Sequence, residues 1–279
     1  MGSGRVLLYS ASSVPSDDHA VASSALRNST GLGLAADAVT PRLALSNIAK
    51  LGPTPLFAPC TQWGLITLFC GMNLQADAKT RSQAFLKARG IRVNEALPFI
   101  EAPEELRPMS AQDVARRSLV LGYMIGIGFR QPGSRLKSQV VKWGLYQSTS
   151  SAERALLEKE EYSQQEIVDA TWLTECVQSL AWGLGMAQID HFRRCDSDLG
   201  PKFPIMSDPS RFIASARLRD FAEIYFQSDL LYRLHWASRD DRMHGRAVTL
   251  DEGLIRERRK AMDWMLGVEP DWDEVPSDT

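Results

Sequence analysis

The chain has 279 residues, of which 44% are hydrophobic and 24% are charged, a composition typical of a globular protein with a sizeable core. A formal net charge of −2 and the lack of basic runs interleaved with aromatic residues exclude a strong electrostatic footprint for nucleic acid. The longest apolar stretch, residues 119–129, is much shorter than the roughly 20 residues that cross a bilayer, so no membrane anchor is expected.

The cysteines are scattered along the chain without a C-x-x-C spacing, and they are Cys60, Cys70, Cys176 and Cys195. A disulfide framework would be unusual in a chain of this length, which favours a reducing, cytoplasmic setting. Cys176 falls within an apolar helical pattern and is expected to be a small core residue.

The first 71 residues differ from the rest of the chain. They are rich in serine and alanine and carry only seven charged side chains, four basic and three acidic. Such a stretch has little to bury, so it is predicted to be disordered. Three interpretations of it are open: a targeting peptide, a disordered tail, or an extension that precedes a true start at Met72. The lack of an Arg-rich amphipathic pattern disfavours the targeting peptide. A helical domain is predicted over residues 72–279.

The first helix is predicted over residues 73–89, because apolar side chains recur on one face and Gly90 is a natural stop. Residues 91–93 are expected to form a short extended piece. Ser110, with an acid three residues later, opens a second helix that is predicted to reach about Gly128.

A third helix is predicted over residues 136–146, followed by a serine-rich join. Ser163 and Glu166 then form a capping box ahead of a long helix, in which apolar residues repeat at three- and four-residue steps as far as Leu184. More than half of the circumference of this helix is apolar, so we expect it to be central in the fold.

Asp208 and Pro209 form a cap with proline in the first helical turn. Two last helices are predicted over residues 218–244 and 252–267, and strand signals are sparse throughout. The predicted class is therefore mainly α. It is one multi-helical globular domain with at most a few short strands, preceded by a disordered N-terminal segment.

On a helical wheel, the predicted helix 218–244 carries, beside an apolar stripe, a charged stripe of four residues: Asp229, Arg233, Trp236 and Asp240. Asp229 precedes Arg233 by four residues, which is the orientation that pairs best on a helix. An exposed pair contributes about 0.3–0.5 kcal/mol, whereas removing one partner of a buried pair costs roughly 3–5 kcal/mol. Asp241 falls inside the apolar stripe, so the helix is expected to fray or turn there.

We expect this stripe to belong to a structural network that joins two or three helices, with a further acid supplied from elsewhere in the chain. The predicted members are Glu175, Asp229, Arg233, Trp236, Asp240, Arg242, Glu257 and Trp272. In a catalytic alternative, Asp229, Asp240 and Glu257 act as general acid and base, and Arg233 or His235 stabilises charge. Trp272, close to the end of the sequence, is expected to fill a hydrophobic gap between helices.

Neither a cofactor nor a metal ion is expected from the motifs. Residues 126–131 fail the glycine pattern of a phosphate loop, and no G-x-S-x-G is present. His191 and Cys195 lie four residues apart without further ligands nearby, and His235 and His244 lie nine apart; neither arrangement matches zinc-ligand spacing.

Several stretches of the last third are similar to the signature of domain-of-unknown-function family 4272, a mainly bacterial family. They are Leu218-Arg219, Asp229 to Ala237, Glu257 to Trp264, and Trp272 to Thr279. The resemblance extends over roughly residues 79–279 and implies a single helical domain. It implies no activity, because none is established for the family.

Two functions are compatible with these observations. We favour a non-enzymatic cytoplasmic domain that binds another protein, as immunity proteins do, because catalytic motifs and cofactor loops are lacking. The alternative is a hydrolase that uses the acid-and-arginine stripe. Neither nucleic acid nor membrane is an expected partner, and the oligomeric state is left open. An open cleft around Asp229, Arg233, Asp240 and Glu257 would favour the enzyme, whereas burial between helices would favour the structural network.

Overall fold

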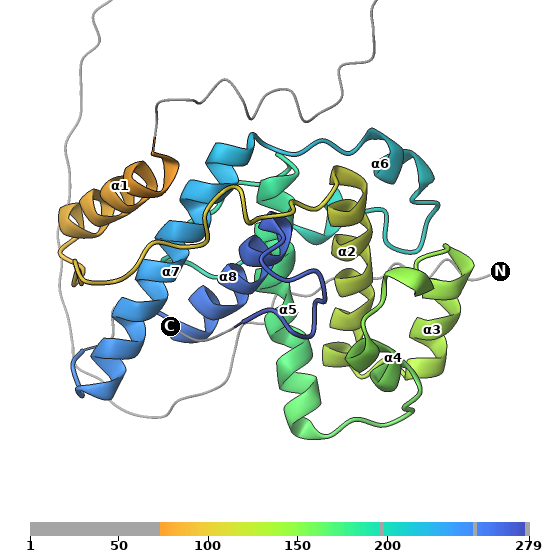
Figure 1. Ribbon diagram of the computed structural model, residues 1–279. Coiled ribbons are helices and arrows are strands. Elements are labelled where there is room, and N and C mark those ends of the chain that lie inside the picture. Colours follow the sequence, from red (N-terminus) through yellow and green to blue (C-terminus); the bar gives the residue numbers. More distant parts are fainter. Residues whose placement is uncertain (1–72, 196–197, 248–249, 277–279) are drawn as a thin grey trace, which may run out of the picture. The chain divides into compact units, whose positions relative to one another are not determined.

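The computed structural model describes residues 73–195, 198–247 and 250–276 (Figure 1). The expectations for residues 1–71 and for a start at Met72 lie outside the described residues. The described part consists of eight α-helices and three short 3-10 helices and contains no strand, which confirms the mainly α class. Residues 91–93, where a short extended piece is expected, form no strand. None of the described helices is long and apolar enough to cross a membrane.

The α-helices of the described residues are α1 (Leu74–Ala88), α2 (Ala111–Met124), α3 (Gly133–Lys142), α4 (Ser151–Leu157), α5 (Gln164–Gly183), α6 (Ser210–Ser215), α7 (Phe221–Met243) and α8 (Glu252–Leu266). Of these, α1, α2, α5, α7 and α8 lie close to predicted ranges, whereas no range was predicted for α4 and only a start was predicted for α6. The 3-10 segments are η2 (Ile125–Phe129), η3 (Tyr146–Ser148) and η4 (Gly200–Lys202).

Side-chain caps set the predicted helix starts. The Ser110 hydroxyl accepts a hydrogen bond from the backbone N–H of Asp113 at 3.1 Å. Ser163 and Glu166 satisfy each other in a complete capping box at the start of α5. The third helix, however, ends at Lys142 instead of Tyr146. Gly144 there takes a left-handed conformation (φ 67°) that ends the helix, and the last carbonyls accept bonds from the N–H groups that follow.

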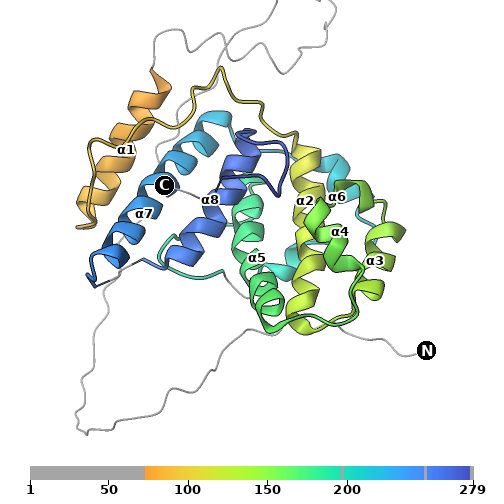
Figure 2. The same ribbon diagram turned by 60° about the horizontal axis from the view of Figure 1, so that its bottom comes forward.

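Five helices lie side by side in the order α1, α7, α8, α5, α2 (Figure 2). α7 therefore packs against α1 on one side and α8 on the other. The chain after α1 also runs along α7, where the Tyr225 hydroxyl donates to the Glu101 carbonyl at 2.8 Å. Because α7 is covered from several sides, even its polar residues are buried, including Ser228, Asp229, Arg233, His235 and Ser238.

The end of α8 docks tightly against the segment before α2. Gly267 ends the helix with φ 73°, and a Cβ at this position would lie 1.9 Å from the Arg107 carbonyl oxygen. Two residues away on each segment, the Met109 N–H donates to the Met265 carbonyl at 2.9 Å. This close approach fixes α8 relative to α2.

Candidate functional site

The acid–arginine pair predicted on α7 is sealed inside the protein. Arg233 Nε and Nη2 donate to the two carboxylate oxygens of Asp229 at 2.9 and 2.8 Å, and each residue is only 1% exposed. Arg233 Nη2 also lies 3.3 Å from the Pro98 carbonyl, whereas its Nη1 has no hydrogen-bond partner among the described residues. Both carboxylate oxygens are thus engaged, and solvent hardly reaches the pair.

The other acid of the stripe, Asp240, makes its ion pairs at the far end of α7. Its carboxylate contacts Arg246, lies 3.2 Å from His244 Nδ1 and lies 3.4 Å from Arg92 Nε. The neighbouring Asp241 accepts from Arg246 Nε at 2.7 Å. α7 consequently continues through Asp241 as far as Met243. The prediction that the helix frays or turns at Asp241 is wrong, because Arg246 compensates the charge of Asp241. Asp240 and the buried pair are held by different partners.

Trp236 and Arg242 complete the predicted stripe and its flank. Trp236 is half-buried and packs against the core. Arg242 forms an exposed pair with Glu252, with Nε 2.6 Å from Oε2. His235 is buried with Nδ1 3.4 Å from Arg259 Nη1, and burial, followed by the Arg259 charge, lowers its pKa to about 4. A histidine in this position is neutral at physiological pH.

The two glutamates expected to reach this stripe lie elsewhere. Glu257 lies beside Cys176. The Sγ of Cys176 donates to the backbone carbonyl of Glu257 at 3.3 Å and lies 3.4 Å from Oε2 of the Glu257 side chain. Cys176 is fully buried, as predicted, and burial raises the pKa of its thiol. Glu175 pairs with Arg258, not with Arg233.

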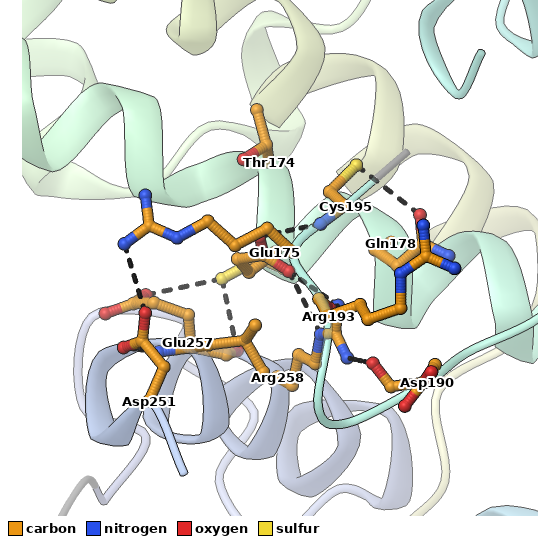
Figure 3. A network of polar contacts seen from close by, with 12 residues as sticks. Thr174, Glu175, Gln178, Asp190, Arg193, Cys195, Asp251, Glu257 and Arg258 are labelled. Atoms are coloured by element: carbon orange, nitrogen blue, oxygen red, sulfur yellow. Dashed lines mark hydrogen bonds and ion pairs between the residues drawn. The ribbon is translucent and has the colours of Figure 1, made fainter. Parts of the chain in front are cut away.

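The Glu175–Arg258 pair is the centre of a polar network between α5 and α8 (Figure 3). Arg258 Nε and Nη2 donate to one Glu175 oxygen at 3.0 and 2.8 Å. The same guanidinium donates to the carbonyls of Asp190 at 2.6 Å and Arg193 at 2.8 Å. The second Glu175 oxygen accepts from the Cys195 N–H at 2.9 Å. The buried Glu175–Arg258 pair thus holds the backbone of the loop 190–195 through these hydrogen bonds.

On this loop the side chain of Phe192 faces solvent, with 41% of its area exposed. Its ring stacks on Phe85 of α1, with centroids 6.3 Å apart and an interplanar angle of 18°. The Arg89 guanidinium lies 3.6 Å from the Phe85 centroid and 5.6 Å from that of Phe192. We call Phe85, Arg89, Phe192 and Arg193 the Phe192 surface.

The residue before Phe192 points the other way. His191 is 4% exposed and contacts Gln227 of α7. Burial, and next the charge of Arg258, lowers the pKa of His191 to about 3. The loop is therefore anchored by a neutral histidine as well as by backbone contacts, and only its outward side chains are free to meet another molecule.

A third buried pair, between Arg117 and Glu153, lies against Trp272 near the end of the described chain. Arg117 Nη1 donates to Glu153 at 2.7 Å, and its guanidinium lies 4.9 Å from the ring centroid of Trp272. Trp272 is 5% exposed and meets Trp264 edge-on at 5.6 Å. The position of Trp272 agrees with the expectation that it fills a gap between helices.

Sequence reasoning included Glu175 in the network but missed its partner in holding the loop, Arg258. Arg258 falls within the family-like stretch Glu257 to Trp264, yet it lies four residues from both Leu254 and Met262, which are buried on α8. That helical spacing was a signal that Arg258 faces inward. Phe192 carried no comparable signal, because a single aromatic residue in a loop has no period.

The described chain is thus an all-α domain braced by buried arginine–carboxylate pairs. Within it, no three His, Cys, Asp or Glu side chains come together in a way that could hold a metal ion. Residues 78–275 match the family described as Domain of unknown function (DUF4272), and the chain belongs to this family. Neither a curated protein nor a solved structure matches the chain.

Proposed function

We propose that this chain is a non-enzymatic, cytoplasmic protein-binding domain whose contact surface is centred on Phe192. The observation that carries the proposal is an exposed aromatic side chain on a loop that a fully buried ion pair holds in place. Aromatic residues are enriched among the anchors of protein interfaces. A loop that is already ordered loses little conformational entropy when a partner binds, so the anchor is effective.

The state of the acidic residues weighs against the hydrolase. A general acid or base must come within hydrogen-bonding reach of the reacting group. Asp229 is 1% exposed and both of its oxygens accept from Arg233, while Asp240 is surrounded by three basic side chains. Their partners are internal to the domain, which favours a structural role. The buried Cys176 thiol, donating to a carbonyl, suits a reducing compartment.

The test compares the wild-type chain with two variants, each of which carries one substitution at an exposed apolar residue. Phe192→Asp places a charge at the centre of the proposed surface, and Val141→Asp does the same on α3, where Val141 is 54% exposed. Each protein is immobilised and incubated with extract of the native host. We expect one host protein to be retained by wild type and by Val141→Asp but lost from Phe192→Asp.

Melting temperatures of both variants are measured alongside, because an exposed substitution changes stability by only about 0.5 kcal/mol or less. Lost retention with an unchanged melting temperature would then reflect the surface itself. The proposal is wrong if all three proteins retain the same set of host proteins.

A further inference from the structure

We infer that the partner presents an acidic segment with an aromatic or aliphatic side chain to the Phe192 surface. This inference rests on the proposed function and adds the chemistry of the partner. Its basis is the combination of two stacked aromatic rings with Arg89, which lies over one of them, and with the exposed Arg193 next to Phe192 in the loop; neither arginine forms an ion pair with a described residue.

Arg89 and Arg193 are exposed, and neither forms an ion pair with any of the described residues. The other cations nearby are compensated. Lys87 pairs with Glu95 at 2.9 Å, and Arg194 pairs with Asp251 at 3.0 Å. The Arg89 charge therefore remains unneutralised beside the rings of Phe85 and Phe192, and a second such charge, on Arg193, follows Phe192 in the loop.

Arg89 is also held in position. Its guanidinium lies over the Phe85 ring, and this cation–π contact orients the planar fork while its N–H groups stay available at the edge. A fork of this kind binds a carboxylate through two parallel hydrogen bonds. A partner acid would thus meet a donor whose geometry is set before binding.

Asp190, the acidic residue of the loop, forms no ion pair with Arg89 or Arg193. The Asp190 carboxylate turns back into the loop and accepts from the Phe192 N–H at 3.0 Å. That bond orients the loop backbone and leaves the exposed ring of Phe192 open. An apolar side chain of the partner can pack on this ring while an adjacent acid reaches Arg89 or Arg193.

A protein segment fits this surface better than nucleic acid does. Nucleic-acid affinity is gained by neutralising many phosphates, and tight binders make about 6–10 such contacts. The Phe192 surface offers two cations, Arg89 and Arg193, that form no ion pair within the described ranges, on a chain of net charge −2. One or two carboxylates next to an apolar side chain match this charge.

The probe is a fluorescently labelled random copolymer of glutamate and tyrosine, whose binding to the full chain is followed by anisotropy. The double variant Arg89→Glu/Arg193→Glu reverses the two cations, and Arg135→Glu/Lys142→Glu makes the same change in net charge on exposed residues of α3. We expect the first double variant to bind about tenfold more weakly than wild type and the second to bind like wild type.

Three further outcomes decide the inference. A copolymer of lysine and tyrosine should bind the Arg89→Glu/Arg193→Glu variant better than it binds wild type, because the charge is swapped. Equal binding of the acidic copolymer to both double variants would overturn the inference, and tighter binding of single-stranded DNA than of the copolymer would replace the protein segment by nucleic acid.

Failure of the inference can be told apart from failure of the proposed function. If Phe192→Asp loses the host protein but Arg89→Glu/Arg193→Glu keeps it, the partner is not recognised by its acids and the proposed function stands. If Phe192→Asp keeps it, both are wrong.

Discussion

At the scale of single residues, the buried Asp229–Arg233 pair makes a measurable prediction. Asp229→Asn removes the charge that compensates Arg233, whose Nη1 already lacks a partner among the described residues. We expect the free energy of unfolding to fall by about 3–5 kcal/mol. Urea denaturation measures this change. Glu252→Gln, which breaks the more exposed pair with Arg242, is the control and should cost less than about 1 kcal/mol.

A double variant separates the value of the pair from the cost of stranding one member. Asp229→Leu with Arg233→Met replaces both charges by apolar side chains of similar length. Such replacements of buried ion pairs are often neutral, so the double variant should regain most of the stability that Asp229→Asn loses. A double variant no more stable than the single one would contradict this account of the pair.

The lowered pKa of His191 predicts how the free energy of unfolding depends on pH. Its pKa is about 3 in the folded protein and about 6.5 in an unfolded chain. Between these values the unfolded state binds a proton that the folded state does not, so stability is present above pH 6.5 and is lost as pH falls toward 3. The loss between pH 6.5 and 5 is about 2 kcal/mol.

Asp263 acts in the opposite direction. Burial raises the pKa of Asp263 to about 6. Its contribution to stability therefore grows as pH falls from 6 toward the lower pKa that an aspartate has in the unfolded chain. The contribution of His191 is therefore isolated by comparing wild type with His191→Asn at pH 7 and pH 5. The variant should lose less stability than wild type on acidification; identical losses would contradict the role of His191.

At the scale of elements, the glycines that follow α8 and α5 form a matched pair. Gly267 and Gly185 have almost the same left-handed φ, 73° and 71°, but only Gly267 approaches another backbone, at Arg107. Gly185→Ala should cost about 1 kcal/mol from the conformation alone. Gly267→Ala should cost at least about 3 kcal/mol, because α8 must also move away from Arg107. Chemical denaturation of both variants measures the difference, and equal costs would show that the close approach is unimportant.

Helix boundaries could be predicted where the signal is local. Ser110 and the capping box of Ser163 and Glu166 act within one turn, and the structure has all three in the predicted roles. The 3-10 segment that follows Met124 was not predicted, since a change from α to 3-10 geometry leaves the apolar pattern almost unchanged. The end of α7 lies within one residue of its predicted position, but the fraying expected at Asp241 is wrong, because the counter-charge to Asp241, Arg246, lies beyond the helix.

In the candidate site, contacts within one helix could be predicted from the sequence, whereas contacts between helices could not. Asp229 and Arg233 are four residues apart on one helix, so their pairing follows from helix geometry. Glu175 and Arg258 lie 83 residues apart, and their contact exists only because α5 packs on α8. A helical wheel also ignores distance along the axis, which is why Asp240 was grouped with Asp229 although the two have different partners.

At the scale of the whole molecule, buried charges connect the parts of the fold. Glu175–Arg258 joins α5, α8 and the loop 190–195, and Arg117–Glu153 joins α2 to α4. These pairs join elements that lie far apart in the sequence, which supports the proposal of an ordered surface at the loop 190–195.

The link between the joint and the loop can be tested directly. Glu175→Gln keeps the size of the side chain but removes the charge that holds Arg258, so the loop 190–195 should loosen. We expect the Cys195 amide, which donates to Glu175, to exchange hydrogen about tenfold faster or more, while amides in the middle of α2 change little. Glu252→Gln serves as the control. Unchanged exchange at Cys195 would mean that the pair does not hold the loop.

The most direct measurement for the central claim is site-specific crosslinking in the native host. A photoreactive benzoyl-phenylalanine replaces Phe192 in the full chain, and in a parallel protein it replaces Val141, which is also exposed. We predict that irradiation gives a discrete adduct with one host protein from position 192 and none from position 141. The same adducts from both positions, or none from either, would contradict a partner-binding surface at Phe192.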